Sequence, residues 1–262
     1  MQGYKDNYTL RDENSIFWLT VSSVIGDRED QQDSAGYEIK HDEGIVIVCD
    51  GMGGHSGGKT ASTIAVETIL RNYLSNYPCE MPYSMIQASL IEADKKISEL
   101  KNQDGELLHA GSTAVTVFLK GNQMHWASVG DSRIYIYRKG SLIKATIDHN
   151  LKSLLERQYQ MKQISQIEYD RQICQGEVLV SFLGNGMPFI EANEKAVHVM
   201  PDDRILLVTD GLYKQLTDEE LASVVSNFEN TDDALFAIEK KVQRKSKNVL
   251  RDNMTVAIIK IK

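Results

Sequence analysis

The sequence has few of the residues that build disulfide frameworks, metal-thiolate sites or membrane spans. Its 262 residues include only three cysteines, Cys49, Cys79 and Cys174, which lie far apart and form no CxxC pair. This pattern favours neither a disulfide framework nor a zinc site. No apolar run approaches the length of about 18 residues that crosses a membrane, and the polar N-terminus has no apolar signal core. We therefore expect a cytoplasmic protein without a membrane span.

Positive charge is in the minority. The chain has 29 Lys and Arg against 37 Asp and Glu, a net charge of −8, which disfavours a general nucleic-acid-binding role. Hydrophobic residues at 42% and charged residues at 25% are ordinary for a globular protein of this length, which can bury a substantial core. No coiled-coil pattern or long apolar stripe is present, so we expect a monomer.

Hydrophobic periodicity predicts an alternation of strand blocks and helix pairs. Strands are expected at 16–25, 37–40, 44–49, 113–119, 123–129, 133–138, 142–145, 196–200, 204–208 and 255–261, with the four between 111 and 146 forming an antiparallel meander. Helices are expected at 60–73, 83–100, 151–175, 217–228 and 232–246, after a loose lead-in over residues 1–15. Antiparallel blocks and paired helices favour an α+β fold over a doubly wound sheet.

Four aspartates each lie at the end of a predicted strand: Asp50, Asp131, Asp210 and Asp252. A single Asp-Gly after a strand is more often a simple turn. Four instances, with glycines beside Asp50 that leave the backbone open to close approach, reverse that preference. A set of carboxylates without nitrogen or sulfur ligands is typical of magnesium, manganese or calcium rather than zinc.

A polar loop between the first two predicted strands adds a cation to this set. Residues 26–34 contain Arg28 and, five residues later, Asp33. A guanidinium group matches phosphate with a bidentate fork, so this loop could place Arg28 and Asp33 beside a cation-bound phosphate. The alternative is a solvated loop arginine.

Seven short motifs, in order, resemble the metal-dependent protein phosphatases, the type-2C serine/threonine phosphatases. They are REDQQDS (28–34), CDGMGGHSGG (49–58), GSTA (111–114), VGDSR (129–133), DH (148–149), LVTDGL (207–212) and DNMT (252–255). The DGMGGH form resembles the bacterial branch. The resemblance implies a four-layer α-β-β-α sandwich of two antiparallel sheets flanked by helix pairs. It also implies a single phosphatase domain over residues 1–262, with a flap-like insertion at about 150–190.

The resemblance further implies a binuclear Mg²⁺ or Mn²⁺ centre whose activated water hydrolyses phosphoserine and phosphothreonine monoesters. In that arrangement Asp50 would bridge the two ions, Gly51 would add its carbonyl oxygen, Asp210 and Asp252 would complete the second site, and Asp33 would act through water. Asp131, with Asp210, matches the third-metal site of bacterial members, and Arg28 would hold the substrate phosphate.

Two departures from the family pattern limit what the resemblance implies. Met52 stands where some members carry a histidine that can act as general acid, and His55 lies three residues further on, so the general acid stays unassigned. Residues 172–183 do not follow the usual flap pattern, which leaves substrate choice open. The implied partners are phosphoproteins, those of a cognate Ser/Thr kinase. Two alternatives stay open: a catalytically silent binding module with the phosphatase fold, and a phosphatase of small phosphoesters.

Overall fold

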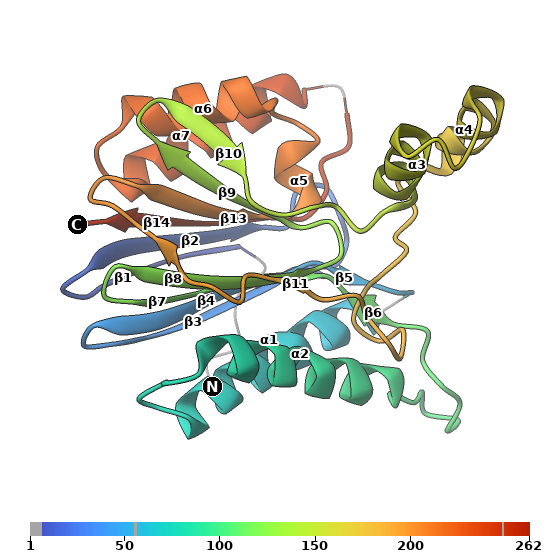
Figure 1. Cartoon of the computed structure of the whole chain (residues 1–262), viewed down its shortest axis with the longest axis horizontal. Coiled ribbons are helices and arrows are strands. Elements are labelled where there is room, and N and C mark those ends of the chain that lie inside the picture. Colours follow the sequence, from blue (N-terminus) through green and yellow to red (C-terminus); the bar gives the residue numbers. More distant parts are fainter. Residues whose placement is uncertain (1–6, 55–56, 248) are drawn as a thin grey trace.

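Two stacked antiparallel sheets lie between two layers of helices (Figure 1). The computed structural model describes residues 7–54, 57–247 and 249–262. The predicted α+β sandwich is confirmed, because each sheet carries its helix pair on the outer face and the inner faces pack against each other.

The first sheet is formed by strands from both ends of the chain and from its middle. Helices α6 (Asp218–Asn227) and α7 (Thr231–Lys245) cover its outer face (Figure 1). Thr217 caps α6 in a capping box with Glu220, as its spacing predicts. The strand order is β1 (Tyr8–Glu13), β2 (Phe17–Val24), β14 (Met254–Ile261), β13 (Arg204–Val208), β9 (Arg133–Arg138) and β10 (Ser141–Lys144).

The second sheet is covered by α1 (Gly57–Ser75) and α2 (Pro82–Ser98). Its strand order is β11 (Glu191–Ala192), β8 (Gln123–Val129), β7 (Ala114–Lys120), β4 (Glu43–Cys49) and β3 (Ser34–Lys40), and β12 (Val197–His198) also pairs with β8. A two-stranded sheet of β5 (Gly51–Met52) and β6 (Gly111–Ser112) lies at one end of the sandwich.

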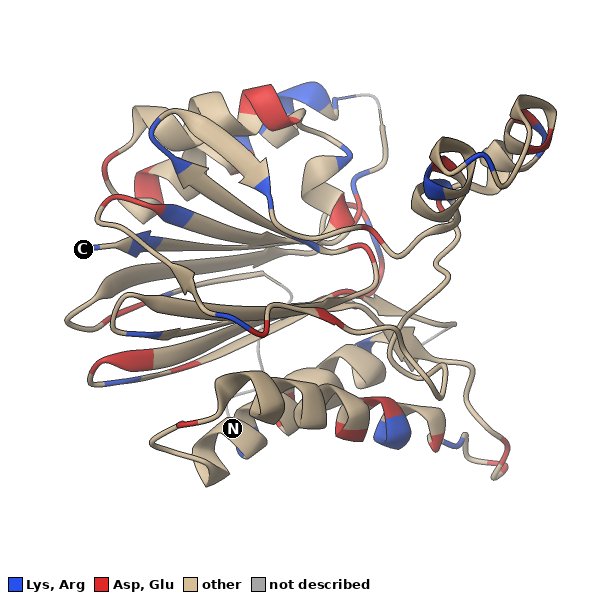
Figure 2. Cartoon of the chain, in the orientation of Figure 1, with Lys and Arg blue, Asp and Glu red and all other residues tan. Residues whose placement is uncertain are grey.

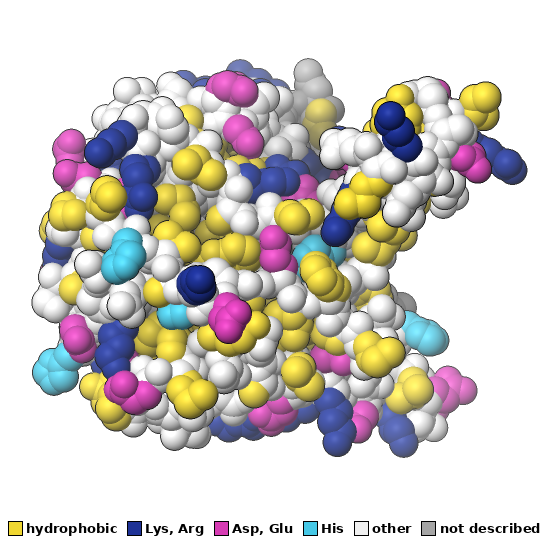
Figure 3. Space-filling view, viewed as in Figure 1, with side chains coloured by type: hydrophobic (Ala, Val, Ile, Leu, Met, Phe, Trp, Pro, Cys, Tyr) yellow, Lys and Arg dark blue, Asp and Glu magenta, His cyan; other side chains and the backbone are white. Residues whose placement is uncertain are grey.

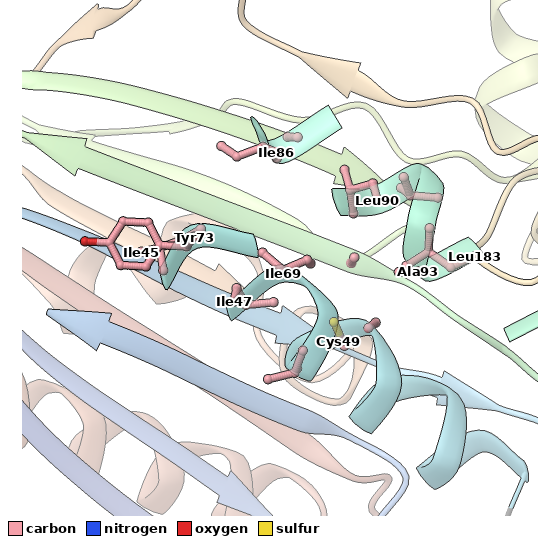
Figure 4. Packing of buried hydrophobic residues seen from close by; sticks show 14 of the residues in the cluster. Ile45, Ile47, Cys49, Ile69, Tyr73, Ile86, Leu90, Ala93 and Leu183 are labelled. Atoms are coloured by element: carbon pink, nitrogen blue, oxygen red, sulfur yellow. The ribbon is translucent and has the colours of Figure 1, made fainter. Parts of the chain in front are cut away.

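Strand β4 shows how the sequence pattern divides the core into layers. Its residues Ile45, Ile47 and Cys49 pack against α1 and α2, as Figure 4 shows. The alternate residues Val46 and Val48 pack between the two sheets. Because successive side chains of a strand point to opposite faces, a strand covered on both sides is apolar at every position.

Three sequence expectations about the elements are wrong. Residues 8–13 form edge strand β1, paired with β2, rather than a loose lead-in. The four strands between 111 and 146 are not one meander: β7 and β8 belong to one sheet, and β9 and β10 to the other. The helix expected over 151–175 breaks into α3 (Leu151–Gln160), α4 (Gln166–Gln172) and the short 3₁₀ helix η1 (Ile173–Gln175). The break contains Lys162, whose φ of 58° is incompatible with a continuing helix.

Helices α3 and α4 project away from the sandwich, close to the end where β5, β6 and α5 (Asp210–Tyr213) lie (Figure 1). In Figure 3 this projecting segment overhangs an open notch in the surface. The segment returns to the body where Leu183 pairs with Ser112 of β6. None of the helices in the described part of the chain is long and apolar enough to span a membrane.

Candidate functional site

The four strand-end aspartates come from four strands of the two sheets and meet at one end of the sandwich. Asp50 directly follows β4, and Asp131 follows β8 after one glycine. Asp210 begins α5 after β13, and Asp252 precedes β14. Figure 2 shows acidic segments at this end, next to α5. The topology thus brings together residues that are up to about 200 positions apart in the chain.

The other four carboxylates of this group all affect the pKa of Asp50. Burial raises its pKa well above the ordinary value, and the carboxylates of Asp33, Asp210, Asp131 and Asp252 raise it further. Carboxylates that raise one another's pKa are close enough to repel, and a bound cation would relieve that repulsion.

The GST motif fixes the backbone of Asp50. The Asp50 amide donates to Thr113 Oγ1 at 2.9 Å, and the Asp50 carbonyl accepts from the Thr113 amide at 2.8 Å and from Ser112 Oγ at 3.1 Å. The sequence analysis named this motif only as part of the family resemblance. The structure assigns it the positioning of Asp50.

Gly51 lies where no side chain fits. A Cβ atom there would collide with the carbonyl oxygen of Gly58, at the start of α1, and would lie 2.6 Å from the carbonyl oxygen of Gln32. Glycine at position 51 therefore allows direct backbone contact between β5, α1 and the loop of residues 26–34, called the Arg28 loop below. This packing keeps the Gly51 backbone beside Asp50.

Asp33 is fully buried beside the same carboxylates. Thr209 Oγ1 donates to its Oδ2 at 2.9 Å, while Oδ1 has no hydrogen-bond partner among the described residues. Burial raises the pKa of Asp33 to about 7, and the charges of Asp210 and Asp252 contribute. A buried carboxylate oxygen without a partner is costly, and it is the kind of group that a water or cation satisfies.

Arg28 reaches the group from the exposed loop. Its guanidinium donates to Asp252 Oδ2 at 2.6 Å, and this bond, with the charges of Asp210 and Asp50, raises the pKa of Arg28. The side chain is 61% exposed. Arg28 is therefore a largely solvated loop arginine, as the sequence alternative has it, and it also contacts a site aspartate.

Asn253 holds the Arg28 loop in place, a role that sequence reasoning missed. Its amide group donates to the carbonyls of Ile25 and Asp30, and its Oδ1 accepts from the Gln32 amide at 2.8 Å. The sequence signal for this role was the position of the asparagine, directly after Asp252 in the DNMT motif.

Two consecutive residues at the end of α5 contact the remaining aspartates. Tyr213 OH donates to Asp131 Oδ2 at 3.0 Å, and Lys214 Nζ lies 2.7 Å from Asp210 Oδ2. Burial, followed by the charge of Asp210, raises the pKa of Asp131 to about 6. No motif in the sequence marked Tyr213 or Lys214.

The histidines contribute no general acid to the described site. His149 is buried, and its Nδ1 accepts from the Gly130 amide at 3.1 Å. Burial lowers the pKa of His149 to about 4, so the ring is neutral at physiological pH. Met52 has no proton to give, and His55 lies outside the described residues.

The donor chemistry fits hard divalent cations, and four of the five carboxylates also have a side-chain partner within the described residues. No three Asp, Glu, His or Cys side chains converge on a single point within residues 7–54, 57–247 and 249–262. The partners are Arg28 for Asp252, Lys214 for Asp210, Tyr213 for Asp131 and Thr209 for Asp33. Five carboxylates with two cationic side chains leave excess negative charge, and an oxygen-only set suits Mg²⁺ or Mn²⁺.

Comparisons with known proteins agree with this geometry. The family model described as protein phosphatase 2C matches residues 20–158, more than half of the chain. A serine/threonine phosphatase, stp, of Listeria monocytogenes is 28% identical over 205 residues, which cover 76% of this chain and 79% of the relative.

Solved structures share the fold across nearly the whole chain. The serine/threonine phosphatase of S. agalactiae superimposes with a TM-score of 0.78 at 24% identity, covering 94% of this chain and all of that one. The catalytic domain of the phosphatase PstP, solved in complex with two manganese ions, gives a TM-score of 0.74 at 20% identity and covers 94% of this chain and 98% of that one. With its fold, its strand-end aspartates and the match of the family model over more than half of its length, the chain belongs to the protein phosphatase 2C family.

Proposed function

We propose that the protein is a serine/threonine protein phosphatase that hydrolyses phosphoserine and phosphothreonine monoesters with two bound Mg²⁺ or Mn²⁺ ions. The observation that carries the proposal is the convergence of Asp50, Asp33, Asp210, Asp131 and Asp252 at one end of the sandwich. Family membership supports the activity, and the manganese complex of PstP supports the choice of metal.

The residues that would hold the ions follow from the resemblance and lie together in the fold. They are Asp50, the Gly51 carbonyl, Asp210 and Asp252, with Asp33 acting through water. When bound, two such ions lower the pKa of a shared water and offset the charge on the phosphate oxygens. The hydrogen bond from Thr209 keeps one oxygen of Asp33 in place and leaves the other for that water.

Arg28 would bind and orient the substrate phosphate. Its exposed guanidinium is held at the site by the 2.6 Å contact with Asp252. Once Asp252 holds an ion, the guanidinium can donate to phosphate oxygens, which it matches in geometry and charge. Arg28 would then favour the transition state, because charge on those oxygens is offset by fixed donors.

Neither Met52 nor His149 supplies a side-chain acid for the leaving oxygen. Met52 cannot donate a proton, and His149 is neutral and buried, with Nδ1 occupied by the Gly130 amide. We infer that the departing serine or threonine oxygen takes its proton from solvent water.

The wider setting remains part of the same proposal. Residues 1–262 would act as one phosphatase domain, with residues 150–190 as a flap that contributes to substrate choice. The substrates would be phosphoproteins made by a cognate Ser/Thr kinase, and the protein would work as a monomer. Its cytoplasmic location stays a prediction from the sequence.

The test compares a phosphothreonine peptide with an aryl phosphate, each with and without Mn²⁺. We expect Mn²⁺-dependent hydrolysis with a higher kcat/KM for the peptide, because a protein phosphatase gains binding energy from the chain around the phosphate. A higher kcat/KM for the aryl phosphate would favour a phosphatase of small phosphoesters. Folded protein that binds the peptide without hydrolysing it would favour a binding module.

A further inference from the structure

Helix α5 supplies partners to both carboxylates that the family resemblance assigns to a third metal ion. Lys214 Nζ lies 2.7 Å from Asp210 Oδ2, and Tyr213 OH lies 3.0 Å from Asp131 Oδ2. The two partners are adjacent in sequence, and Asp210 is the first residue of the same helix. The chain itself thus provides an ammonium group for Asp210 and a hydroxyl group for Asp131.

Lys214 is held in this position by a second carboxylate. Its Nζ also lies 3.5 Å from Glu177, which follows η1 in the projecting segment. The ammonium group therefore lies between two carboxylates, which favour its charged form. The lysine therefore acts as a permanent positive charge next to the aspartate pair.

The cleft beside Lys214 carries charges of both signs. Its volume is about 350 Å³, it lies between α3 and α5, and it is lined by Arg133, Lys144, Lys152 and Lys214 together with Asp148, Glu156 and Glu177, with Tyr213 in its wall. The Arg133 guanidinium lies 3.6 Å from the centre of the Tyr213 ring. A divalent ion that enters the Asp131–Asp210 pair would have to displace the Lys214 ammonium group, whose positive charge repels it.

We propose that Lys214 is a tethered cation that serves the Asp131–Asp210 pair in place of a third metal ion, so that the protein binds two divalent ions and not three. The inference rests on the proposed two-ion function. An ammonium group attached through α5 has a high effective concentration at the pair, whereas a free ion must be captured from solution. Because Lys214 contacts Oδ2 of Asp210, Oδ1 can still serve the binuclear centre.

The experiment counts bound Mn²⁺ by electron paramagnetic resonance of the free ion, titrated to millimolar concentration. We expect two ions in the wild type and three in Lys214→Met. Lys152→Met removes the same charge from the same cleft without touching Asp210, and it should still bind two. Because Lys214 is 44% exposed, the substitution should fold, which circular dichroism would check. Lys214→Gln serves as a second variant.

A double variant identifies the added site. Adding Asp131→Asn to Lys214→Met should return the count from three to two, because the third ion needs the Asp131 carboxylate. Three bound ions in the wild type would overturn the inference, and so would two bound ions in both Lys214→Met and Lys214→Gln. Either result would leave the proposed two-ion function intact. A wild type that binds no Mn²⁺ would instead overturn the two-ion function itself.

Discussion

Thr209 joins two parts of the site that are 176 positions apart in the chain. Its Oγ1 donates to Asp33 Oδ2 at 2.9 Å and accepts from the Thr255 amide at 2.9 Å. All three residues are buried, so the hydroxyl satisfies one buried carboxylate oxygen and one buried backbone N–H. One hydroxyl thus links the Arg28 loop to the ends of β13 and β14.

Thr209→Val should remove this link with little change in shape. We expect the free energy of unfolding to fall by about 1–3 kcal/mol, because a buried carboxylate and an amide each lose a partner. Urea denaturation measures the change. Thr209→Ser keeps the hydroxyl and should retain most of the stability. A wild-type stability in Thr209→Val, with a loss only in Thr209→Ser, would show that the methyl group, not the hydrogen bonds, matters.

Gly211→Ala should disturb the contact between the ends of β13 and β14. A Cβ atom at this position would collide with the carbonyl oxygen of Asn253 and lie 2.9 Å from its carbonyl carbon. Because neither atom belongs to a flexible side chain, we expect a loss of about 1–3 kcal/mol in the free energy of unfolding. Gly54→Ala is the control, since a Cβ at Gly54 meets no atom within 4 Å. Unchanged thermal melting of Gly211→Ala would contradict the close approach.

Arg28→Ala should weaken substrate binding and leave metal binding intact. Loss of charged hydrogen bonds to phosphate is expected to lower kcat/KM for a phosphothreonine peptide by about ten- to a hundredfold. Mn²⁺ affinity should not fall, because Asp252 loses a competing cation. Arg11→Ala removes an exposed arginine that pairs with Asp232 on α7, and it should be without effect. An unchanged kcat/KM in Arg28→Ala would exclude Arg28 from phosphate binding.

His149 should make stability depend on pH between about 4 and 6.5. Burial lowers its pKa from 6.5 to about 4, so in this window the unfolded chain binds a proton that the folded protein does not. Stability therefore rises with pH across the window, is complete above 6.5, and is lost as pH falls to 4, by about 3 kcal/mol in total. His149→Asn should show a shallower rise in urea denaturation, and an identical slope would contradict this assignment.

The strand-end aspartates could be predicted from the sequence because the signal for each is local. An apolar run that ends in Asp-Gly marks both the strand and the position of the carboxylate, as at Asp50 and Asp210. The local sequence does not determine where these strands lie in the fold. The hairpins on either side of Asp131 look like one continuous meander, yet they belong to different sheets, since the sequence does not say which edge a hairpin joins.

The residues that support the site could not be predicted in the same way. Thr209 and Asn253 act through contacts with distant parts of the chain. Lys214 contacts Asp210 four residues before it, but such a spacing of lysine and aspartate also occurs on ordinary surface helices. Strand β1 was missed because an edge strand needs only one apolar face, and its alternation of Tyr8 and Leu10 with polar residues is short.

The central claim is that catalysis requires divalent ions held by the strand-end aspartates. The measurement is Mn²⁺ binding and phosphothreonine-peptide hydrolysis by the wild type, Asp50→Asn and Asp252→Asn, with Asp104→Asn in an exposed loop as the matched control. We predict Mn²⁺-dependent hydrolysis in the wild type and the control. In Asp50→Asn and Asp252→Asn both bound Mn²⁺ and activity should be lost or strongly reduced, with folding retained. Full activity without Mn²⁺, or unchanged activity in both site variants, would contradict the account.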